Sequence, residues 1–339
     1  MEKEFSVKNR IFHTNFGKGM VIKMRILVYG AGVIGCELAH LMNTPDNEVV
    51  LLARGEWKCT IERNGLMMKH CGYLYTSIDK LSVIDELKSD DYYDLIFVVM
   101  TYHHVKEILP FLQNNCSKNI LFIGNNANPQ SYEKAINTTL IHKKEVLFGF
   151  TGIGGERRNN KIISMHTPKI SLLIGGLEHY PSKELQSIIT TIFSDTSCQI
   201  EWEENMQGWL LTHLAFILPT TYICYHQNFH LAKTDIATMK LMIEAVKEAH
   251  IMLKESGYQI RPVNEDKSYD TDYSKKMKKL FLLFKTPAGK FVISNHCKHG
   301  VTEMIELDKQ FQFLRQKSNT PMPAWDKLRN LSQPAKEQY

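Results

Sequence analysis

Three glycines near the amino end have the spacing of a phosphate-binding turn. Gly30, Gly32 and Gly35 follow an apolar run at 26–28 that is typical of a buried strand, and an apolar helical pattern follows them. In such a turn the first glycine permits the bend, the second leaves room for a pyrophosphate, and the third lets the helix lie close to the sheet. The alternative is a glycine-rich turn without a ligand. We predict that the dinucleotide is bound by Gly30, Ala31, Gly32, Val33, Ile34 and Gly35.

Arg54 indicates which dinucleotide binds. Residues 48–53 form the next expected strand, about 20 residues after the glycine turn, where NAD-binding folds place an acid on the ribose 2′-hydroxyl. Arg54 stands near that position instead and would attract a 2′-phosphate through charge-assisted hydrogen bonds, with Lys58 adding positive charge. NADP is therefore the predicted cofactor. Alternatively, Arg54 is a solvated loop residue and Glu56 contacts the ribose.

The composition argues against nucleic-acid and membrane partners. The 41 basic and 36 acidic residues give a net charge of only +5, without a basic block. The seven cysteines are scattered and form no Cys-x-x-Cys, which is typical of a reduced cytoplasmic protein. Residues 1–23 lack the apolar core of a signal peptide and are expected to be a disordered extension. The apolar run at 209–225 is interrupted by His213 and Pro219, so it predicts a buried helix bent at the proline.

The elements that would position these residues alternate between strands and helices as far as about residue 200. Continuous apolar runs at 95–100, 119–123 and 146–150 are typical of parallel strands buried on both faces. A strand pair that extends the sheet is expected at 161–165 and 170–174. Helices are expected at 104–112, ending at or just beyond Pro110, and at 181–193.

Helical patterns dominate the rest of the chain. They lie at 204–225, 234–256, 271–284, 287–316 (in one or two pieces) and 324–331. We therefore predict an α/β fold with a Rossmann-type doubly wound parallel sheet over residues 24–201, followed by an all-helical domain over 202–339. Ligands of such sheets bind outside the carboxyl ends of the strands, so the substrate is expected in a cleft between the two domains.

These features resemble the ketopantoate reductase (2-dehydropantoate 2-reductase) family. The resemblance extends from about Met24 to about Leu331. It is carried by the glycine turn, the segment Leu-Leu-Ala-Arg-Gly-Glu at 51–56, Asn125 after the fifth strand, Pro219 within a helix, and Thr302-Glu303-Met304. It implies NADPH-dependent reduction of a 2-oxo acid held between the two domains.

The chain departs from the family at polar positions. The family's catalytic lysine, nine residues before the helix proline, corresponds to Leu210, and a second lysine after the fourth strand corresponds to Thr101. The asparagine before the proline is Leu218, and the usual Asn-Gly-x-Gly is Asn-Asn-Ala-Asn at 125–128. Because hydride addition to a ketone builds negative charge on the oxygen and needs a positioned acid, another group must act or the reaction differs.

His213 is the first candidate for the missing proton donor. It lies one helical turn from Leu210, and the ordinary histidine pKa of about 6.5 suits proton transfer. The alternative is a hydrogen-bonded core histidine. His103 and His104, after the fourth strand, are further candidates to replace the lysine of that loop.

Two more residues complete the predicted catalytic set. Glu303 corresponds to the family's substrate-domain glutamate and would hold a substrate hydroxyl or carbonyl; otherwise it is a solvated charge beside Glu306. Asn125 would bond the nicotinamide ribose or the substrate rather than only end a strand, and Thr101 is expected beside the cofactor.

No metal is predicted from the histidine pairs of the sequence. His296 with His299, and His226 with His230, have ligand spacing but no recognised third ligand. The sequence therefore predicts an NADP(H)-dependent oxidoreductase that acts on a small 2-oxo acid or related carbonyl, with a homodimer as the candidate assembly. The alternative is a non-catalytic NADP(H)-binding sensor or interaction protein.

Overall fold

A mixed eight-stranded sheet organises the amino-terminal part of the molecule. Its order is β12-β11-β8-β7-β6-β1-β2-β5. Neighbouring strands from β5 to β8 are parallel, β11 runs antiparallel to β8, and β12 runs parallel to β11. The strands are β1 (Met24–Tyr29), β2 (Asn47–Leu52), β5 (Ser82–Ile84), β6 (Leu95–Val98), β7 (Asn119–Ile123), β8 (Glu145–Thr151), β11 (Ile170–Gly175) and β12 (Cys198–Trp202).

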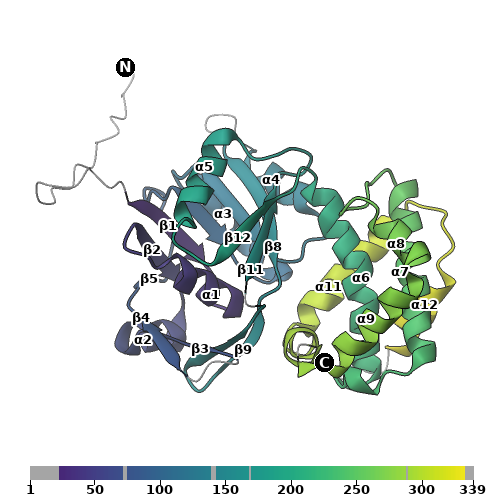
Figure 1. The fold of residues 1–339 in the computed structure, drawn as a ribbon. Coiled ribbons are helices and arrows are strands. Elements are labelled where there is room, and N and C mark those ends of the chain that lie inside the picture. Colours follow the sequence, from purple (N-terminus) through teal and green to yellow (C-terminus); the bar gives the residue numbers. More distant parts are fainter. Residues whose placement is uncertain (1–22, 72–74, 139–142, 168, 288, 333–339) are drawn as a thin grey trace, which may run out of the picture.

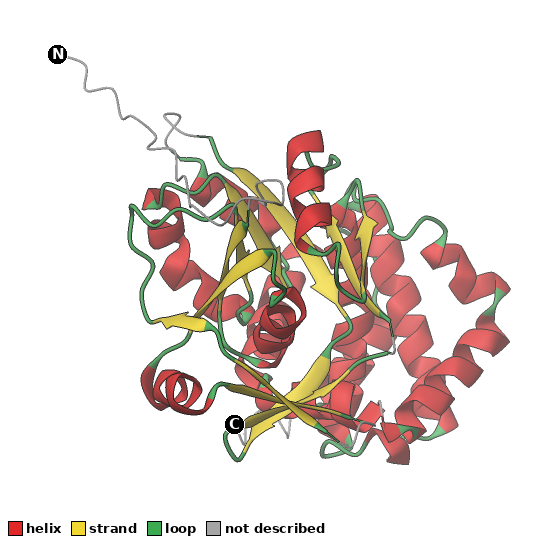
Figure 2. Ribbon diagram, turned by 60° about the vertical axis from the view of Figure 1, so that its left-hand side comes forward, coloured by secondary structure: helices red, strands yellow, loops and turns green. Residues whose placement is uncertain are grey.

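The computed structural model describes residues 23–71, 75–138, 143–167, 169–287 and 289–332. The predicted extension therefore lies, apart from Lys23, outside the described residues. The strands gather in one part of the molecule and the remaining part is made of helices alone (Figure 1, Figure 2). The predicted fold class, a doubly wound sheet followed by helices, is confirmed.

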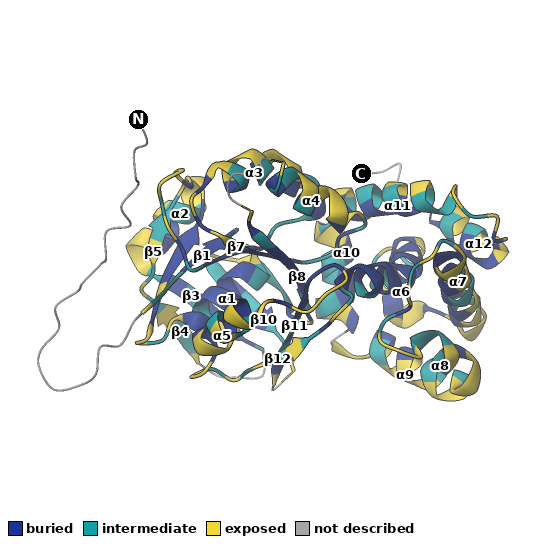
Figure 3. Cartoon of the chain, turned by 90° about the horizontal axis from the view of Figure 1, so that it is seen from above, coloured by how far each residue is buried: buried dark blue, intermediate teal, exposed yellow. Residues whose placement is uncertain are grey.

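Helices cover both faces of the sheet. These are α1 (Val33–Met42), α2 (Gly55–Asn64), α3 (Tyr102–Asn114), α4 (Pro129–Ile136) and α5 (Lys183–Ile192). Alternate residues of β1 enter different apolar clusters, Leu27 one and Ile26 the other, which explains the continuous apolar run at 26–28. Figure 3 shows the strands in dark blue between helices that expose one face. The helix α3 includes Pro110 because its buried face continues to Leu112.

A second, four-stranded sheet packs against α1. Its strands are β3 (Leu66–His70), β4 (Thr76–Asp79), β9 (Gly154–Arg158) and β10 (Lys161–Met165), in the order β4-β3-β10-β9. The prediction that 161–165 extends the main sheet was wrong, since β10 pairs with β3 and β9. The physical reason is that only alternate residues of β10 are buried, as expected for a strand covered on one face.

The carboxyl-terminal part is helical. It contains α6 (Met206–His226), η2 (Leu231–Lys233), α7 (Ile236–Glu255), α8 (Glu265–Thr271), α9 (Tyr273–Lys285), η3 (Gly289–Ser294), α10 (Asn295–His299), α11 (Val301–Arg315) and α12 (Pro323–Leu331). The helix predicted at 287–316 is divided into a π-helical turn and two helices, with Gly300 between α10 and α11. α6 continues through Pro219 and is buried over most of its surface. None of the described helices combines the length and apolarity that crossing a bilayer requires.

A polar and aromatic network holds the last helices together. The Tyr222 hydroxyl on α6 donates to Asp308 Oδ1 at 2.6 Å, and Arg329 Nε donates to Asp308 Oδ2 at 3.1 Å. Trp325 is fully buried and stacks on Phe311 with ring centroids 4.8 Å apart. These contacts fix α11 and α12 against α6, so that the residues at the start of α11 have a fixed position toward the sheet.

The buried His250 on α7 predicts acid sensitivity of the fold. Burial lowers its pKa to about 4, whereas the unfolded chain takes up the proton near pH 6.5. The unfolded state therefore binds more protons between these values, and stability is lost as the pH falls from 6.5 toward 4. Between pH 7.5 and 4.5 the free energy of unfolding should fall by about 2–3 kcal/mol less in His250→Gln than in the unmodified protein. Urea unfolding at the two pH values measures this difference. The exposed His230→Gln is the control, and an equal acid loss in all three proteins would contradict the assignment.

Candidate functional site

The glycine turn has the geometry that a bound diphosphate requires. Gly30 has φ +121°, and a Cβ there would lie 2.2 Å from the carbonyl oxygen of Val99. A Cβ on Gly35 would lie 1.9 Å from the carbonyl oxygen of Gly30, so α1 packs directly on the turn. A Cβ on Gly32, by contrast, would meet nothing within 4 Å. The first and third glycines are therefore required by the fold, while the second faces open space.

The start of α1 is available to an anion. Its N-cap is Gly32, no side chain caps the helix, and the first backbone bond is that of Cys36 N–H to the Gly32 carbonyl at 2.9 Å. The helix therefore presents N–H groups of Val33, Ile34 and Gly35 at its positive end. The indole of Trp57 on α2 donates to the Ala31 carbonyl at 3.0 Å and holds the turn from outside. The residues present thus fit the pyrophosphate of a dinucleotide.

Arg54 lies just beyond β2, at the N-cap of α2. Its Nη2 donates to the Tyr29 hydroxyl at 2.9 Å and its Nε to the Asp85 carbonyl at 3.4 Å, which holds the exposed side chain beside the end of β1. Lys58 is paired with the Asp85 carboxylate at 2.7 Å, so much of its charge is balanced. The guanidinium of Arg54 is therefore the cation best placed to bind an anionic group at the carboxyl end of β2.

A second arginine near the turn was missed by the sequence analysis. Arg157, an exposed residue of β9, lies over the Trp57 ring with Cζ 5.1 Å from its centroid. β9 runs beside α1, because a Cβ on Gly155 would come within 3.1 Å of Val33. Trp57 therefore connects the guanidinium to the glycine turn. No local motif marks Arg157, since the contact depends on the second sheet.

Glu303 joins the two parts of the molecule. Its buried carboxylate, at the start of α11, accepts the N–H of Tyr102 at the start of α3 through Oε1 at 3.0 Å. The other oxygen, Oε2, lies 3.7 Å from His296 Nε2 on α10. Figure 1 shows α11 on the side of the helical part that faces the sheet. The predicted alternative, a solvated charge, does not describe this carboxylate, which is 4% exposed.

His213 sits in an aromatic surrounding on α6. Its ring stacks on Trp209 with centroids 5.1 Å apart and an interplanar angle of 9°. The centroid of the Phe150 ring, near the end of β8, lies 4.3 Å from that of His213. Burial, together with the nearby His296, lowers the pKa of His213 to about 4. The ring is therefore neutral at pH 7, which differs from the ordinary pKa on which the sequence argument relied.

The positions of the family's lysines carry no cation. Leu210 is 1% exposed and belongs to the apolar cluster of α6, as does Leu218. Thr101 precedes α3, and its hydroxyl is bonded to His104 Nδ1 at 2.9 Å. His103 packs on His104 with ring centroids 4.0 Å apart, and burial lowers its pKa.

Several buried polar atoms at the carboxyl edge of the sheet lack a partner among the described residues. They are Asn125 Oδ1, His103 Nδ1 and Thr151 Oγ1. Asn125 follows β7, and Gly124 before it is bonded to the Gly149 carbonyl of β8. Buried polar groups are normally satisfied, so these atoms indicate where a polar ligand would be received. Asn125 and Thr101 therefore lie at the same edge of the sheet as Gly30.

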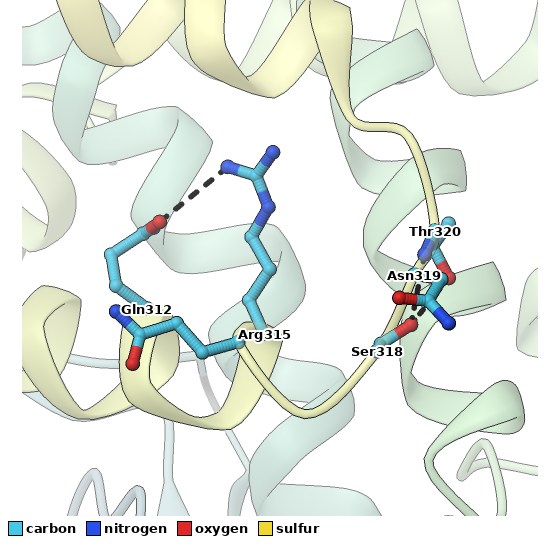
Figure 4. Close-up of a pocket in the computed structure, with 6 residues that line it drawn as sticks. Gln312, Arg315, Ser318, Asn319 and Thr320 are labelled. Atoms are coloured by element: carbon cyan, nitrogen blue, oxygen red, sulfur yellow. Dashed lines mark hydrogen bonds between the residues drawn. The ribbon is translucent and has the colours of Figure 1, made fainter.

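A separate hollow lies at the other end of α11. Figure 4 shows this pocket of about 340 Å³, lined by Gln312, Arg315, Gln316, Ser318, Asn319 and Thr320. Arg315 is held by both oxygens of Asp326, at 2.5 and 2.9 Å. None of the predicted site residues lines it, so it is not the candidate site.

The amino-terminal part matches a known family. Residues 26–178 match the sequence model described as ketopantoate reductase PanE/ApbA. The match covers 153 of the 339 residues, and over them the chain is similar to the ketopantoate reductase family. The resemblance drawn from the sequence is thereby confirmed, while no curated protein matches the chain.

Solved structures share the fold over nearly the whole chain. A PanE/ApbA family ketopantoate reductase from Ralstonia eutropha JMP134 has a TM-score of 0.71 at 16% identity, covering 93% of this chain and 99% of the other. A D-mandelate dehydrogenase solved with NADH and anilino(oxo)acetate has 0.72 at 15%, covering 93% and 99%. The 2-dehydropantoate 2-reductase from Geobacter metallireducens GS-15 has 0.72 at 15%, covering 92% and 100%. At these identities the likeness concerns the fold.

Gly35 and Gly32 predict different outcomes for one added methyl group. Gly35→Ala places a Cβ against the Gly30 carbonyl, so we expect a loss of about 1–3 kcal/mol in unfolding free energy. Gly32→Ala meets no protein atom and should leave stability unchanged, but it should obstruct a bound diphosphate. Thermal unfolding and calorimetry with NADPH would distinguish the two effects. Full NADPH affinity in a folded Gly32→Ala protein would contradict the assigned site.

Proposed function

We propose that the protein is an NADP(H)-dependent oxidoreductase that reduces a small 2-oxo acid or related carbonyl. The observation that carries the proposal is that the glycine turn and Glu303 both approach the segment after β6. A Cβ on Gly30 would lie 2.2 Å from the Val99 carbonyl oxygen, and Glu303 accepts the N–H of Tyr102. The family match supports reductase chemistry. We further propose a cytoplasmic location and a small-molecule substrate, and the homodimer stays a prediction.

The cofactor is proposed to be NADP rather than NAD. Arg54 is exposed beyond the end of β2, and its Nη2 donates a hydrogen bond to the Tyr29 hydroxyl. Other N–H groups of the planar guanidinium remain to bind a 2′-phosphate. Arg157 on Trp57 adds a second cation near the turn. The D-mandelate dehydrogenase of similar fold was solved with NADH, so the fold itself does not decide the choice.

The bound nicotinamide would supply the hydride, and the chain's residues would orient the carbonyl and deliver the proton. Asn125, with its unpartnered Oδ1, is proposed to bond the nicotinamide ribose or the substrate. Glu303 would accept a hydrogen bond from a substrate hydroxyl. His213 is proposed as the proton donor, since an anionic substrate would favour its protonated form. Phe150 and Trp209 provide an apolar wall beside it.

The alternative is a non-catalytic protein that binds NADP(H) and responds to it. The observation that favours it is the replacement of both family lysines by Leu210, which is buried among apolar side chains, and by Thr101. The two functions are separated by NADPH oxidation with a panel of 2-oxo acids. Because an aromatic 2-oxo compound occupies the D-mandelate dehydrogenase, the panel includes phenylglyoxylate beside ketopantoate. Tight NADPH binding without turnover of any member would favour the sensor.

Arg54→Ala tests the cofactor choice. Hydrogen bonds to a charged group contribute about 1.5–3 kcal/mol, so we expect NADPH to bind about 10–100-fold more weakly and NADH to bind as before. The control is Arg63→Ala, which removes an exposed arginine from the other end of α2. An equal loss for both coenzymes, or none for NADPH, would be evidence against a 2′-phosphate contact.

His213→Ala tests the proton donor. General acid catalysis contributes about 10²–10⁴-fold, so kcat should fall within that range while NADPH affinity is kept. With a free-enzyme pKa of about 4, the protonated fraction decreases with rising pH, and kcat/KM should fall between pH 5 and 8 in the unmodified protein. His226→Ala, an exposed residue of the same helix, serves as the control. The assignment fails if the variant keeps both its rate and this pH slope.

A further inference from the structure

A buried cluster of metal-ligating side chains lies between α1 and the second sheet, outside the candidate site. Glu37 of α1, His70 at the end of β3 and His166 just after β10 each offer one ligand atom, and these atoms lie within 4.8 Å of one another. We propose that these three residues bind a divalent transition-metal ion, with zinc as the expected occupant. The site is independent of the proposed reductase function.

The Glu37 carboxylate is the strongest observation. It is 1% exposed, and neither Oε1 nor Oε2 has a hydrogen-bond partner among the described residues. An ionised carboxylate that is buried without hydrogen bonds is costly, so a positive charge must compensate it. The groups that face it are the two histidine rings, with His166 Nε2 3.5 Å from Oε1 and His70 Nδ1 3.6 Å from Oε2.

These separations match a shared metal ion. Metal–nitrogen and metal–oxygen bonds of about 2.0–2.2 Å at a tetrahedral angle place two ligand atoms about 3.4 Å apart. A direct charge-assisted hydrogen bond would be shorter, about 2.7–2.9 Å. The contacts of 3.5 and 3.6 Å, one to each carboxylate oxygen, therefore suit an ion held between the carboxylate and the two rings better than two direct hydrogen bonds.

The orientation of His166 supports the same conclusion. Its Nδ1 lies 2.7 Å from the backbone carbonyl of Thr167, which can only accept, so Nδ1 carries the hydrogen. Nε2, which faces the Glu37 carboxylate at 3.5 Å, is then the ring nitrogen left to coordinate a metal ion. A carbonyl that fixes the tautomer of a histidine in this way is the usual outer partner of a metal ligand.

The sheet supplies the remaining surroundings. Ser164 is the register partner of His70 in the parallel β3–β10 pair, and its fully buried hydroxyl has no partner among the described residues. It is available to a water molecule in a fourth coordination position. Two histidines and one carboxylate suit zinc and are too few in oxygen atoms for calcium or magnesium. The ion would connect the nucleotide-binding helix α1 to β3 and β10.

The test measures metal directly on the full chain, purified without a histidine tag. Mass spectrometry should find about one zinc ion per chain, removable by a chelator, and Co²⁺ added to the stripped protein should give the visible absorption of a tetrahedral site. Glu37→Gln keeps the side-chain shape and should weaken Co²⁺ binding by at least the roughly 10–100-fold that loss of an outer partner costs. His166→Gln should do the same.

His179→Gln is the matched control. His179 Nδ1 also lies beside the carbonyl of the following residue, at 2.9 Å from Tyr180, but the ring has no ion pair with a described carboxylate. This variant should bind Co²⁺ like the unmodified protein. The proposal is overturned if the unmodified protein holds no zinc and shows no Co²⁺ absorption, or if Glu37→Gln and His166→Gln bind Co²⁺ undiminished. The zinc content and Co²⁺ absorption of the unmodified protein test the proposal even if a variant fails to fold. Neither measurement depends on enzymatic turnover.

Discussion

The close approach of α1 to the end of β1 determines the arrangement of the amino-terminal part. Between the Gly30 carbonyl and Gly35 there is no room for even a Cβ, so the helix begins directly at the edge of the sheet. This contact fixes the N–H groups of the first turn toward the nucleotide position. It also sets the buried side of α1, which carries Glu37 toward β3 and β10. One backbone contact thus positions two chemically different sites on the same helix.

The second sheet has more influence on the cofactor site than its size suggests. Its strand β9 brings Arg157 onto Trp57, whose indole holds the Ala31 carbonyl. On its other side β9 comes so close to η3 that a Cβ on Gly154 would lie 2.9 Å from Val292 Cα. The sheet therefore lies against the glycine turn and the helical part at once. A shift of β9 would therefore displace residues at the glycine turn and in the helical part.

The sequence was sufficient wherever one local pattern decides the structure. The apolar runs at 26–28, 95–98 and 120–123 in β1, β6 and β7 were predicted as strands because a strand that is buried on both faces is apolar along that length. The spacing of the glycines predicted the turn between β1 and α1, whereas the role of Arg54 stays a prediction. The strands of the second sheet are short and covered on one face, so their mixed composition gave no clear signal, and β10 was assigned to the wrong sheet.

Contacts between distant residues could not be obtained in that way. Glu303 and Tyr102 are separated by 201 positions, and only the packing of α11 on α3 brings them together. The cluster of Glu37, His70 and His166 has no sequence spacing to recognise, because its members come from α1, β3 and the end of β10. Ligand spacing within a sequence marks only those metal sites that are built on one helix or loop.

The charge balance at the meeting of the two parts explains how the chain could act without the family's lysine. Glu303 is buried, His296 Nε2 lies 3.7 Å from its carboxylate, and its charge also acts on His103. His213 lies close to His296. In the free protein, desolvation disfavours the protonated form of His213 and His103. A substrate carboxylate would bring a second negative charge beside Glu303 and would therefore favour the uptake of a proton by a histidine. In this arrangement the positive charge that a lysine carries permanently would be acquired on substrate binding, which couples protonation of the site to occupancy by an anionic substrate.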